Sequence, residues 1–375
     1  MKLNNQNLFS EYEGAKLDTR TKEGRKSDRS LSAMHARLRI VMTVLGLLLL
    51  SCMVKAQSPA TVLVVANKNN PNSLALANKY MAARKIPASN LLQLNTDAND
   101  NTDHCSLSYY NSNIATPIYA KIAQLPHIDY IVLCRNLPII INDTNGSVDN
   151  ALAAKTTTMS ANPYYGSTLV FDSTKFKMYL VTRLDGWSWD DASKLIDNSV
   201  NAKLGAPFFI DQDPTIVKPD PNAFYNTDMA KAATLLQTRS ITFSMDTTTS
   251  FVCPTYAVGG YASWGSNDRH FNATNFANLK FSPGALGTIA VSTSASNLRY
   301  PGGWQSQVAQ LIHQGITGVD GNVAEPYSMA LASPSLLFSN YARGFNLAEA
   351  YYASYMCVGW KAVVVGDPLC NPYAH

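Results

Sequence analysis

The chain has 375 residues, of which 46% are hydrophobic, so it can bury a large core as one big domain or two ordinary ones. Its formal net charge is +4, but residues 1–57 carry 10 of the 30 Lys and Arg and only 5 of the 26 Asp and Glu. The remaining chain, with 20 basic and 21 acidic residues, gives no electrostatic basis for binding nucleic acid, because such binding depends on clustered Lys and Arg.

The start of the chain has the pattern of an export signal. Residues 40–50 read IVMTVLGLLLL, follow Arg37 and Arg39, and precede a short small-residue stretch that ends at Ala56. This pattern predicts a signal peptide in residues 1–56, cleavage after Ala56, and a periplasmic, outer-surface or secreted protein. The apolar run is shorter than the roughly 20 residues of a membrane span, which disfavours an uncleaved anchor. A second interpretation is a lipoprotein with its lipid on Cys52, since residues 49–52 (LLSC) loosely match a bacterial lipoprotein box.

The first half of the remaining chain alternates between strand and helix patterns. Residues 61–67 (TVLVVAN) predict a strand, and residues 73–85 predict a helix from the spacing of their Ala and Leu. Residues 91–95 predict a strand, residues 114–124 a helix, and residues 128–135 (IDYIVLCR) a further strand. The last run is apolar for most of its length, as expected for a parallel strand covered by helices on both faces.

The second half continues the alternation after an irregular segment, residues 140–165, that we expect to cross the strand ends. Strands are predicted at 177–185, 207–213, 241–245, 255–261 and 286–291, and helices at 189–202 and 230–237. The predicted fold is therefore α/β, with a mostly parallel sheet and helices on both faces. Residues 57–375 form one domain or two fused lobes that meet near residues 214–225, a stretch with three prolines.

Polar residues gather where these strands are predicted to end, and open parallel sheets bind ligands at that edge. The set contains arginines, hydroxyls and carboxylates, with His270 as the only nearby histidine. Structural uses compete with functional ones: Arg183 and Asp185 share a strand face and suit an ion pair, and a serine without a base is a poor nucleophile. The candidate catalytic residues are Asp185, Asp268, Ser294 and Glu325, and the candidate binding residues are Arg135, Arg183, Ser263, Trp264, Ser266 and Asn267.

Metal and cofactor motifs are not found. Five cysteines follow Ala56, none with CxxC spacing or a histidine in a zinc pattern, and we expect Cys134 to be a buried strand residue. One or two disulfides with a free thiol are compatible with an exported chain. Gly-rich phosphate motifs are missing, since residues 318–323 (GVDGNV) lack the required spacing. The sequence predicts neither a metal nor a cofactor.

Several segments resemble a family of exported bacterial proteins to which no activity is assigned: VLVVANKNNPNSLALANKY, DYIVLCRNLP, YLVTRLDG, GGYASWGSND, GITGVDGNVAEPY and VVVGDPLC. More distantly, their order is similar to the gingipain-like branch of the caspase-fold cysteine peptidases. Those enzymes carry a His-Gly pair after one strand and an Ala-Cys pair after the next. Here the matching stretches, residues 263–266 and 292–295, read SWGS and STSA. The resemblance implies the architecture without the catalytic dyad.

Three functional classes follow from these observations. We expect the strand ends to bind a peptide, a glycan or another envelope partner. The alternative is a hydrolase in which Asp185, Asp268 or Glu325 acts with Ser294. A third class, a structural domain of an envelope assembly, predicts a large apolar surface patch.

Overall fold

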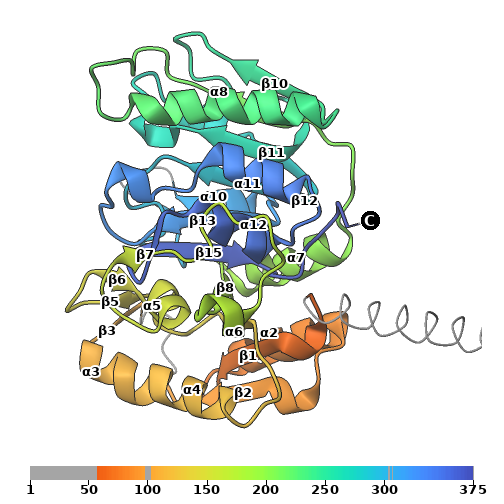
Figure 1. Ribbon diagram of the computed structural model, residues 1–375, viewed down its shortest axis with the longest axis vertical. Helices are drawn as coiled ribbons and strands as arrows, with labels where there is room; N and C mark the ends of the chain where they lie inside the picture. Colours follow the sequence, from red (N-terminus) through yellow and green to blue (C-terminus); the bar gives the residue numbers. More distant parts are fainter. Residues whose placement is uncertain (1–56, 98–102, 303–304, 306, 375) are drawn as a thin grey trace, which may run out of the picture. The chain divides into compact units, whose positions relative to one another are not determined.

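The computed structural model describes residues 57–97, 103–302, 305 and 307–374. The predicted signal peptide, its cleavage position and Cys52 lie outside the described residues. The core is a ten-stranded sheet in the order β10-β9-β11-β12-β13-β15-β8-β4-β1-β2 (Figure 1). The predicted fold class, a mostly parallel sheet with helices, is confirmed.

One set of neighbouring strands is parallel and comes from the first half of the chain. It contains β1 (Val62–Asn67), β2 (Leu91–Leu94), β4 (Tyr130–Cys134) and β8 (Leu180–Leu184). All residues of β1, β4 and β8 are buried, which explains the continuous apolar runs in the sequence. Cys134 is fully buried, as predicted.

A second parallel set comes from the second half. It contains β9 (Phe208–Asp211), β10 (Phe243–Asp246), β11 (Ala257–Ser263), β12 (Lys280–Ile289) and β13 (Gly318–Asn322). Between the two sets lies β15 (Ala362–Gly366), which runs antiparallel to β13 and places Val365 opposite Arg183 of β8. The proline-rich stretch 214–222 connects β9 to the helix that precedes β10.

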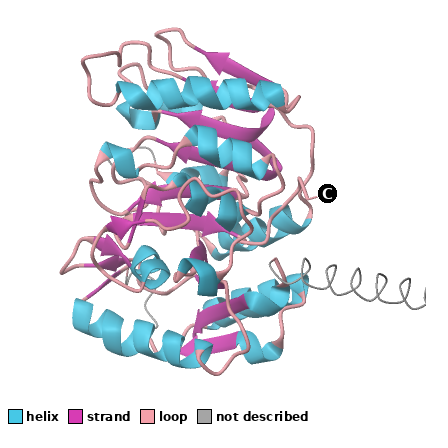
Figure 2. Ribbon diagram, viewed as in Figure 1, coloured by secondary structure: helices cyan, strands magenta, loops and turns pink. Residues whose placement is uncertain are grey.

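Helices cover both faces of this sheet (Figure 2). On one face, α8 (Ala223–Thr238) packs against α11 (Pro334–Tyr341), which packs against α12 (Leu347–Ser354). On the other face, α7 (Trp189–Val200) contacts α2 (Pro71–Arg84) and α10 (Val308–His313). Polar side chains start these helices: Asn70 and Ser188 accept hydrogen bonds from backbone amides of the first turns of α2 and α7. No helix in the described ranges is long and apolar enough to cross a membrane.

Short elements complete the structure. The segment 140–165 is not a plain loop but contains two short strands, a helix and a third short strand. The remaining elements are η1 (Pro59–Thr61), η2 (Ala88–Asn90), β3 (His104–Cys105), α3 (Leu107–Tyr109), the π-helical turn η3 (Tyr110–Ala115), α4 (Thr116–Ile122), β5 (Ile140–Ile141), β6 (Gly146–Ser147), α5 (Val148–Ala154), β7 (Ser160–Ala161), α6 (Ser173–Phe176), η4 (Gly265–Asn267), α9 (Ala273–Ala277), η5 (Ser328–Ala330) and β14 (Cys357–Val358).

Candidate functional site

Two loops meet at the edge of the sheet where β11 and β12 end. Ser263, the last residue of β11, lies beside Ile289, the last residue of β12. The Asn267 side-chain amide then donates a hydrogen bond to the Ala290 carbonyl at 2.6 Å. This hydrogen bond fastens the loop after β11 to the loop after β12.

The predicted binding residues Ser263 and Trp264 stabilise this edge from inside. Ser263 is fully buried, and its hydroxyl accepts a hydrogen bond from the Gly265 amide at 3.0 Å. The Trp264 indole is buried and donates to the Asn226 side chain on α8 at 2.7 Å. The polar atoms of both side chains are therefore hydrogen-bonded within the protein. Ser266 is half-buried and Asn267 is exposed, so of the predicted binding residues in this loop these two reach solvent.

A hollow of about 280 Å³ opens beyond the ends of β11 and β12. Within it the Ser292 hydroxyl donates to the Glu325 carboxylate, with 2.8 Å between Oγ and Oε1. Ser292 is half-buried and Glu325 is exposed, so a ligand can reach both. The other lining residues include Trp264, Asn267, Ala290, Tyr327 and Leu331.

Ser294, the serine preferred as a candidate nucleophile, lies elsewhere. It is fully buried, and its hydroxyl has no hydrogen-bond partner. A Cβ added at Gly321 of β13 would lie 2.5 Å from the Ser294 Oγ, so the two residues are in tight contact. The chain turns between β12 and Ser294, so the strand alternation that would place Ser292 and Ser294 on one face does not apply here. Ser292 is the serine that faces the hollow.

Two further hollows adjoin the first. A polar one of about 390 Å³ shares Glu325 with it and is lined by Thr293, Ser296, Asn297, Gln305 and Gln307. A largely apolar one of about 500 Å³ shares Leu331 with it and includes Tyr165, Phe224, Met329, Ala332 and Met356, together with the charged residues Lys218, Asp220, Asp228 and Lys231. We refer to these three neighbouring hollows together as the strand-end groove, with a polar end, the Glu325 carboxylate in the centre and a largely apolar end.

Asp268 belongs to a separate group of acids at the ends of β9 and β11. Its carboxylate accepts a hydrogen bond from the His270 amide at 2.6 Å, and burial raises its pKa. Nearby Asp211 is fully buried, and burial, with a smaller contribution from the Asp268 charge, raises its pKa to about 8. Asp213, also buried, accepts from the backbone and hydroxyl of Thr215. These carboxylates face one another rather than the strand-end groove.

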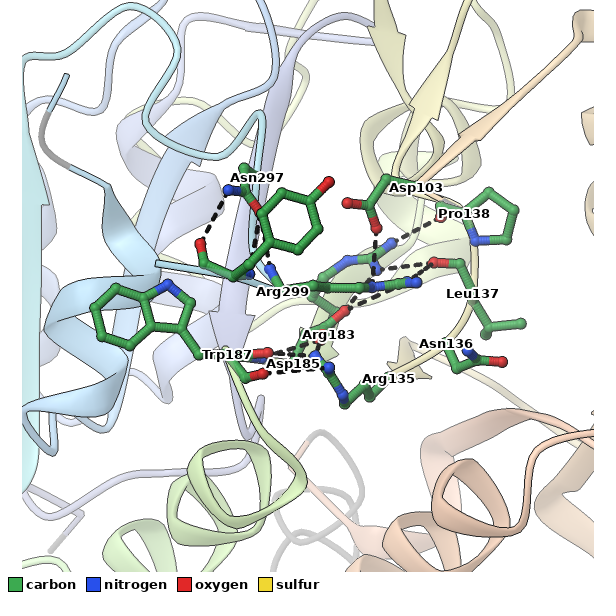
Figure 3. Close-up of polar contacts among 12 residues, drawn as sticks. Asp103, Arg135, Asn136, Leu137, Pro138, Arg183, Asp185, Trp187, Asn297 and Arg299 are labelled. Carbon is green, nitrogen blue, oxygen red and sulfur yellow. Dashed lines mark hydrogen bonds and ion pairs between the residues drawn. The ribbon is translucent and has the colours of Figure 1, made fainter. Parts of the chain in front are cut away.

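Arg135, Arg183 and Asp185 lie in a buried network at the ends of β4 and β8 (Figure 3). The Arg183 guanidinium contacts the Asp149 carboxylate at 2.6 and 3.0 Å and Asp185 at 3.3 Å. Arg135 contacts the other oxygen of Asp185 at 2.9 Å. Burial lowers the pKa of Arg183, but the Asp149 and Asp185 charges outweigh burial and raise it above its ordinary value. The predicted ion pair between Arg183 and Asp185 is therefore present.

The same network reaches the loop that follows β12 (Figure 3). Arg299, which is almost fully buried, pairs with Asp103 at 2.8 Å and donates to the Leu137 carbonyl at 2.8 Å. It also lies 3.9 Å from Asp185. Loops that follow β4, β8 and β12 are thereby held together, although they are far apart in the sequence. The arginines position the strand-end loops and are shielded from solvent.

The predicted catalytic set is thus divided among different places. Asp185 lies in the arginine network, Asp268 among the acids near β9, Ser294 in the core and Glu325 in the strand-end groove, and none of the contacts between described residues joins any two of them. Sequence reasoning did not choose Ser292, although it follows a predicted strand directly.

Thiol chemistry has little support at this edge. The five cysteines in the described chain are unpaired. Cys253, the one closest along the sequence to the loop after β11, is partly buried, and burial raises the pKa of its thiol to about 12. A reactive cysteine needs the opposite shift, toward the thiolate. The stretches 263–266 and 292–295 contain neither a histidine nor a cysteine. Within the second, the Thr293 hydroxyl donates to the Gln305 side chain at 2.6 Å.

One group of metal-ligand atoms occurs among the described residues, formed by His127, Asp129 and Asp172. It lies where β4 begins, and not beside the strand-end groove.

Comparisons with known proteins give similarity at the level of fold. No family model and no curated protein matches the chain. One similar solved structure is the complex of the Porphyromonas gingivalis RgpB pro- and mature domains, 12% identical, covering 83% of this chain and 79% of that one with a TM-score of 0.45. Another, described as the structure of a protease, is 11% identical and covers 84% and 78% with a TM-score of 0.43. The distant similarity to gingipain-like peptidases expected from the sequence is therefore found among solved structures.

Proposed function

We propose that this chain is a binding protein that holds an extended polypeptide segment in the strand-end groove. The observation that carries the proposal is that three hollows of different character are neighbours, since the central one shares Glu325 with one and Leu331 with the other. An extended peptide presents side chains at regular intervals, and a row of distinct hollows can accept them in order.

The apolar end supports a peptide rather than a glycan. Phe224, Met329 and Met356 are all more than 40% exposed, although large apolar side chains are normally withdrawn from water. Methionine adapts its shape to apolar partners and is common at peptide-binding surfaces. Charged side chains also line this end, among them Lys218, Asp220 and Lys231, and they can pair with polar groups of a bound segment beside the apolar contacts. The carboxylate of Glu325 in the centre favours a basic or hydrogen-bond-donating residue of the bound segment.

Binding of random nonapeptides selected from a displayed library tests this proposal. Met329→Glu places a charge in the apolar end, and we expect it to weaken selected peptides at least about tenfold. Leu204→Glu is the matched control, because Leu204 is a similarly exposed apolar residue outside the groove. The proposal is wrong if no peptide is selected, or if Met329→Glu and Leu204→Glu bind selected peptides equally.

One contact favours hydrolysis as a second candidate function. The hydrogen bond between Ser292 and Glu325 joins a hydroxyl to a carboxylate that can accept its proton, the arrangement that an activated serine requires. Glu325→Gln distinguishes the two functions. A binding site loses preference for basic peptides and produces no cleavage in either form, whereas a hydrolase cleaves selected peptides and loses that activity on substitution.

A further inference from the structure

Three side chains with metal-binding atoms meet where β4 begins. His127 and Asp129 immediately precede β4, and Asp172 is the N-cap residue of α6. The Ser173 amide donates to the Asp129 carboxylate at 2.9 Å, and the Ser173 hydroxyl donates to the Ile128 carbonyl at 2.6 Å. These bonds fasten the start of α6 to the start of β4 and bring Asp172 toward the other two side chains.

The ligand atoms are already close to one another. His127 Nε2 lies 2.9 Å from Asp129 Oδ1, and one ligand atom from each of the three residues lies within 4.8 Å of the other two. Around a tetrahedral ion with bonds of about 2.0–2.2 Å, neighbouring ligand atoms are roughly 3.3 Å apart. Small side-chain rotations at the surface therefore suffice to surround an ion.

Asp129 supplies an independent reason to expect a cation. Its side chain is 1% exposed and is directed at His127 through Oδ1, while Oδ2 is buried without a hydrogen-bond partner. Buried carboxylate oxygens are ordinarily satisfied, so this one needs an explanation. A bound dication would complete the coordination of Asp129 and offset the repulsion between the two carboxylates.

We infer that His127, Asp129 and Asp172 bind one divalent transition-metal ion, with Zn²⁺ the best match. One imidazole nitrogen and two carboxylate oxygens suit Zn²⁺, whereas Ca²⁺ and Mg²⁺ prefer ligand sets made of oxygen alone. Water completes the coordination, because His127 is one-third exposed. The ion joins α6 to the sheet. An H-x-D pair with a distant aspartate matches no recognised zinc pattern, so the sequence alone does not indicate this site.

His313 and Asp191 form a natural control pair in the same chain. Their ring nitrogen and carboxylate lie 3.1 Å apart, much like His127 and Asp129. The third charged group near them is Lys194, whose ammonium lies 4.0 Å from Asp191 and repels a cation. Zinc should therefore bind at His127 and not at His313, and replacing His313 controls for the general effect of removing a partly exposed histidine that contacts an aspartate.

Zinc binding by the full chain, produced without a histidine tag and stripped with a chelator, tests the inference. Isothermal titration with zinc chloride near neutral pH should give one ion per chain. His127→Gln and Asp172→Asn should each weaken binding at least about tenfold, and asparagine preserves the N-cap of α6. His313→Gln should leave the affinity unchanged. Zinc should also raise the melting temperature of the wild type and not of His127→Gln.

Two results would overturn the inference. One is a wild-type chain that takes up no zinc. The other is equal affinity in the wild type and in a His127→Gln variant whose circular dichroism shows that it is folded. Because Met329 and Glu325 lie in a different part of the fold, neither result bears on peptide binding.

Discussion

Replacing Arg183 by methionine should cost a large fraction of a domain's usual stability. The Arg183 side chain is fully buried and contacts two carboxylates, Asp149 and Asp185, which are also fully buried. It donates in addition to the carbonyls of Leu137 and Pro138. Methionine fills much of the same volume but leaves both carboxylates without this partner. Removing one member of a buried ion pair typically costs about 3–5 kcal/mol, against a total stability of roughly 5–15 kcal/mol.

Urea unfolding followed by tryptophan fluorescence and circular dichroism measures this loss. Arg239→Met is the control, since Arg239 is exposed at the end of α8 and should change the free energy of unfolding by less than about 0.5 kcal/mol. Adding Asp149→Asn to Arg183→Met should restore part of the lost free energy of unfolding, because it removes one buried charge that has lost its partner. A loss below about 1 kcal/mol in Arg183→Met, with an unchanged urea dependence, refutes the reasoning about uncompensated charge.

Three further substitutions give separate tests. Burial raises the pKa of Asp211 to about 8, against about 3.9 when unfolded, so this carboxyl makes wild-type stability fall as the pH rises between those values. Asp211→Asn should therefore be more stable than the wild type in urea unfolding, and the gain should be largest at pH 8 and above. A stability difference that stays the same at all pH values contradicts this reasoning. Gly321→Ala should lose about 1–3 kcal/mol by overpacking, and adding Ser294→Ala should recover part of it in the same assay; no recovery would show that the contact is not limiting. Asn267→Ala removes the bond to Ala290 and should weaken peptide binding while leaving the melting temperature almost unchanged. Binding equal to that of the wild type would show that this link does not shape the strand-end groove.

Most of the sheet could be predicted because its strands are buried on both faces. Residues 61–67, 128–135 and 207–213 are short apolar runs between polar turns, and β1, β4 and β9 lie within them. Strand bounds were less accurate at β12, which begins at Lys280 and not near residue 286, because Pro283 and Gly284 interrupt the apolar pattern. The fold class depends on the order of the elements, so an error of a few residues in a strand boundary does not change it.

The candidate site was less predictable because its parts come from distant segments. The pairing of Arg183 with Asp185 follows from strand alternation and is present. Their contacts with Asp149 and, through Asp185, with Arg299 join segments that have no common sequence pattern. Strand alternation, extended past the end of β12, places Ser292 and Ser294 on the same face and does not choose between them. Alternation describes extended backbone only, and beyond the turn after Ile289 Ser292 is half-buried whereas Ser294 is fully buried.

The buried arginine network and the strand-end groove are connected through one loop. Arg299 anchors this loop to Asp103 and to the Leu137 carbonyl, and its own amide donates to the Asn297 side chain, which lines the polar end of the groove. The shape of that end is therefore set by buried ionic contacts before any ligand arrives. A groove ordered in advance spares a bound peptide the cost of ordering the loop. Loss of Arg299 should thus weaken peptide binding although the residue is shielded from the ligand.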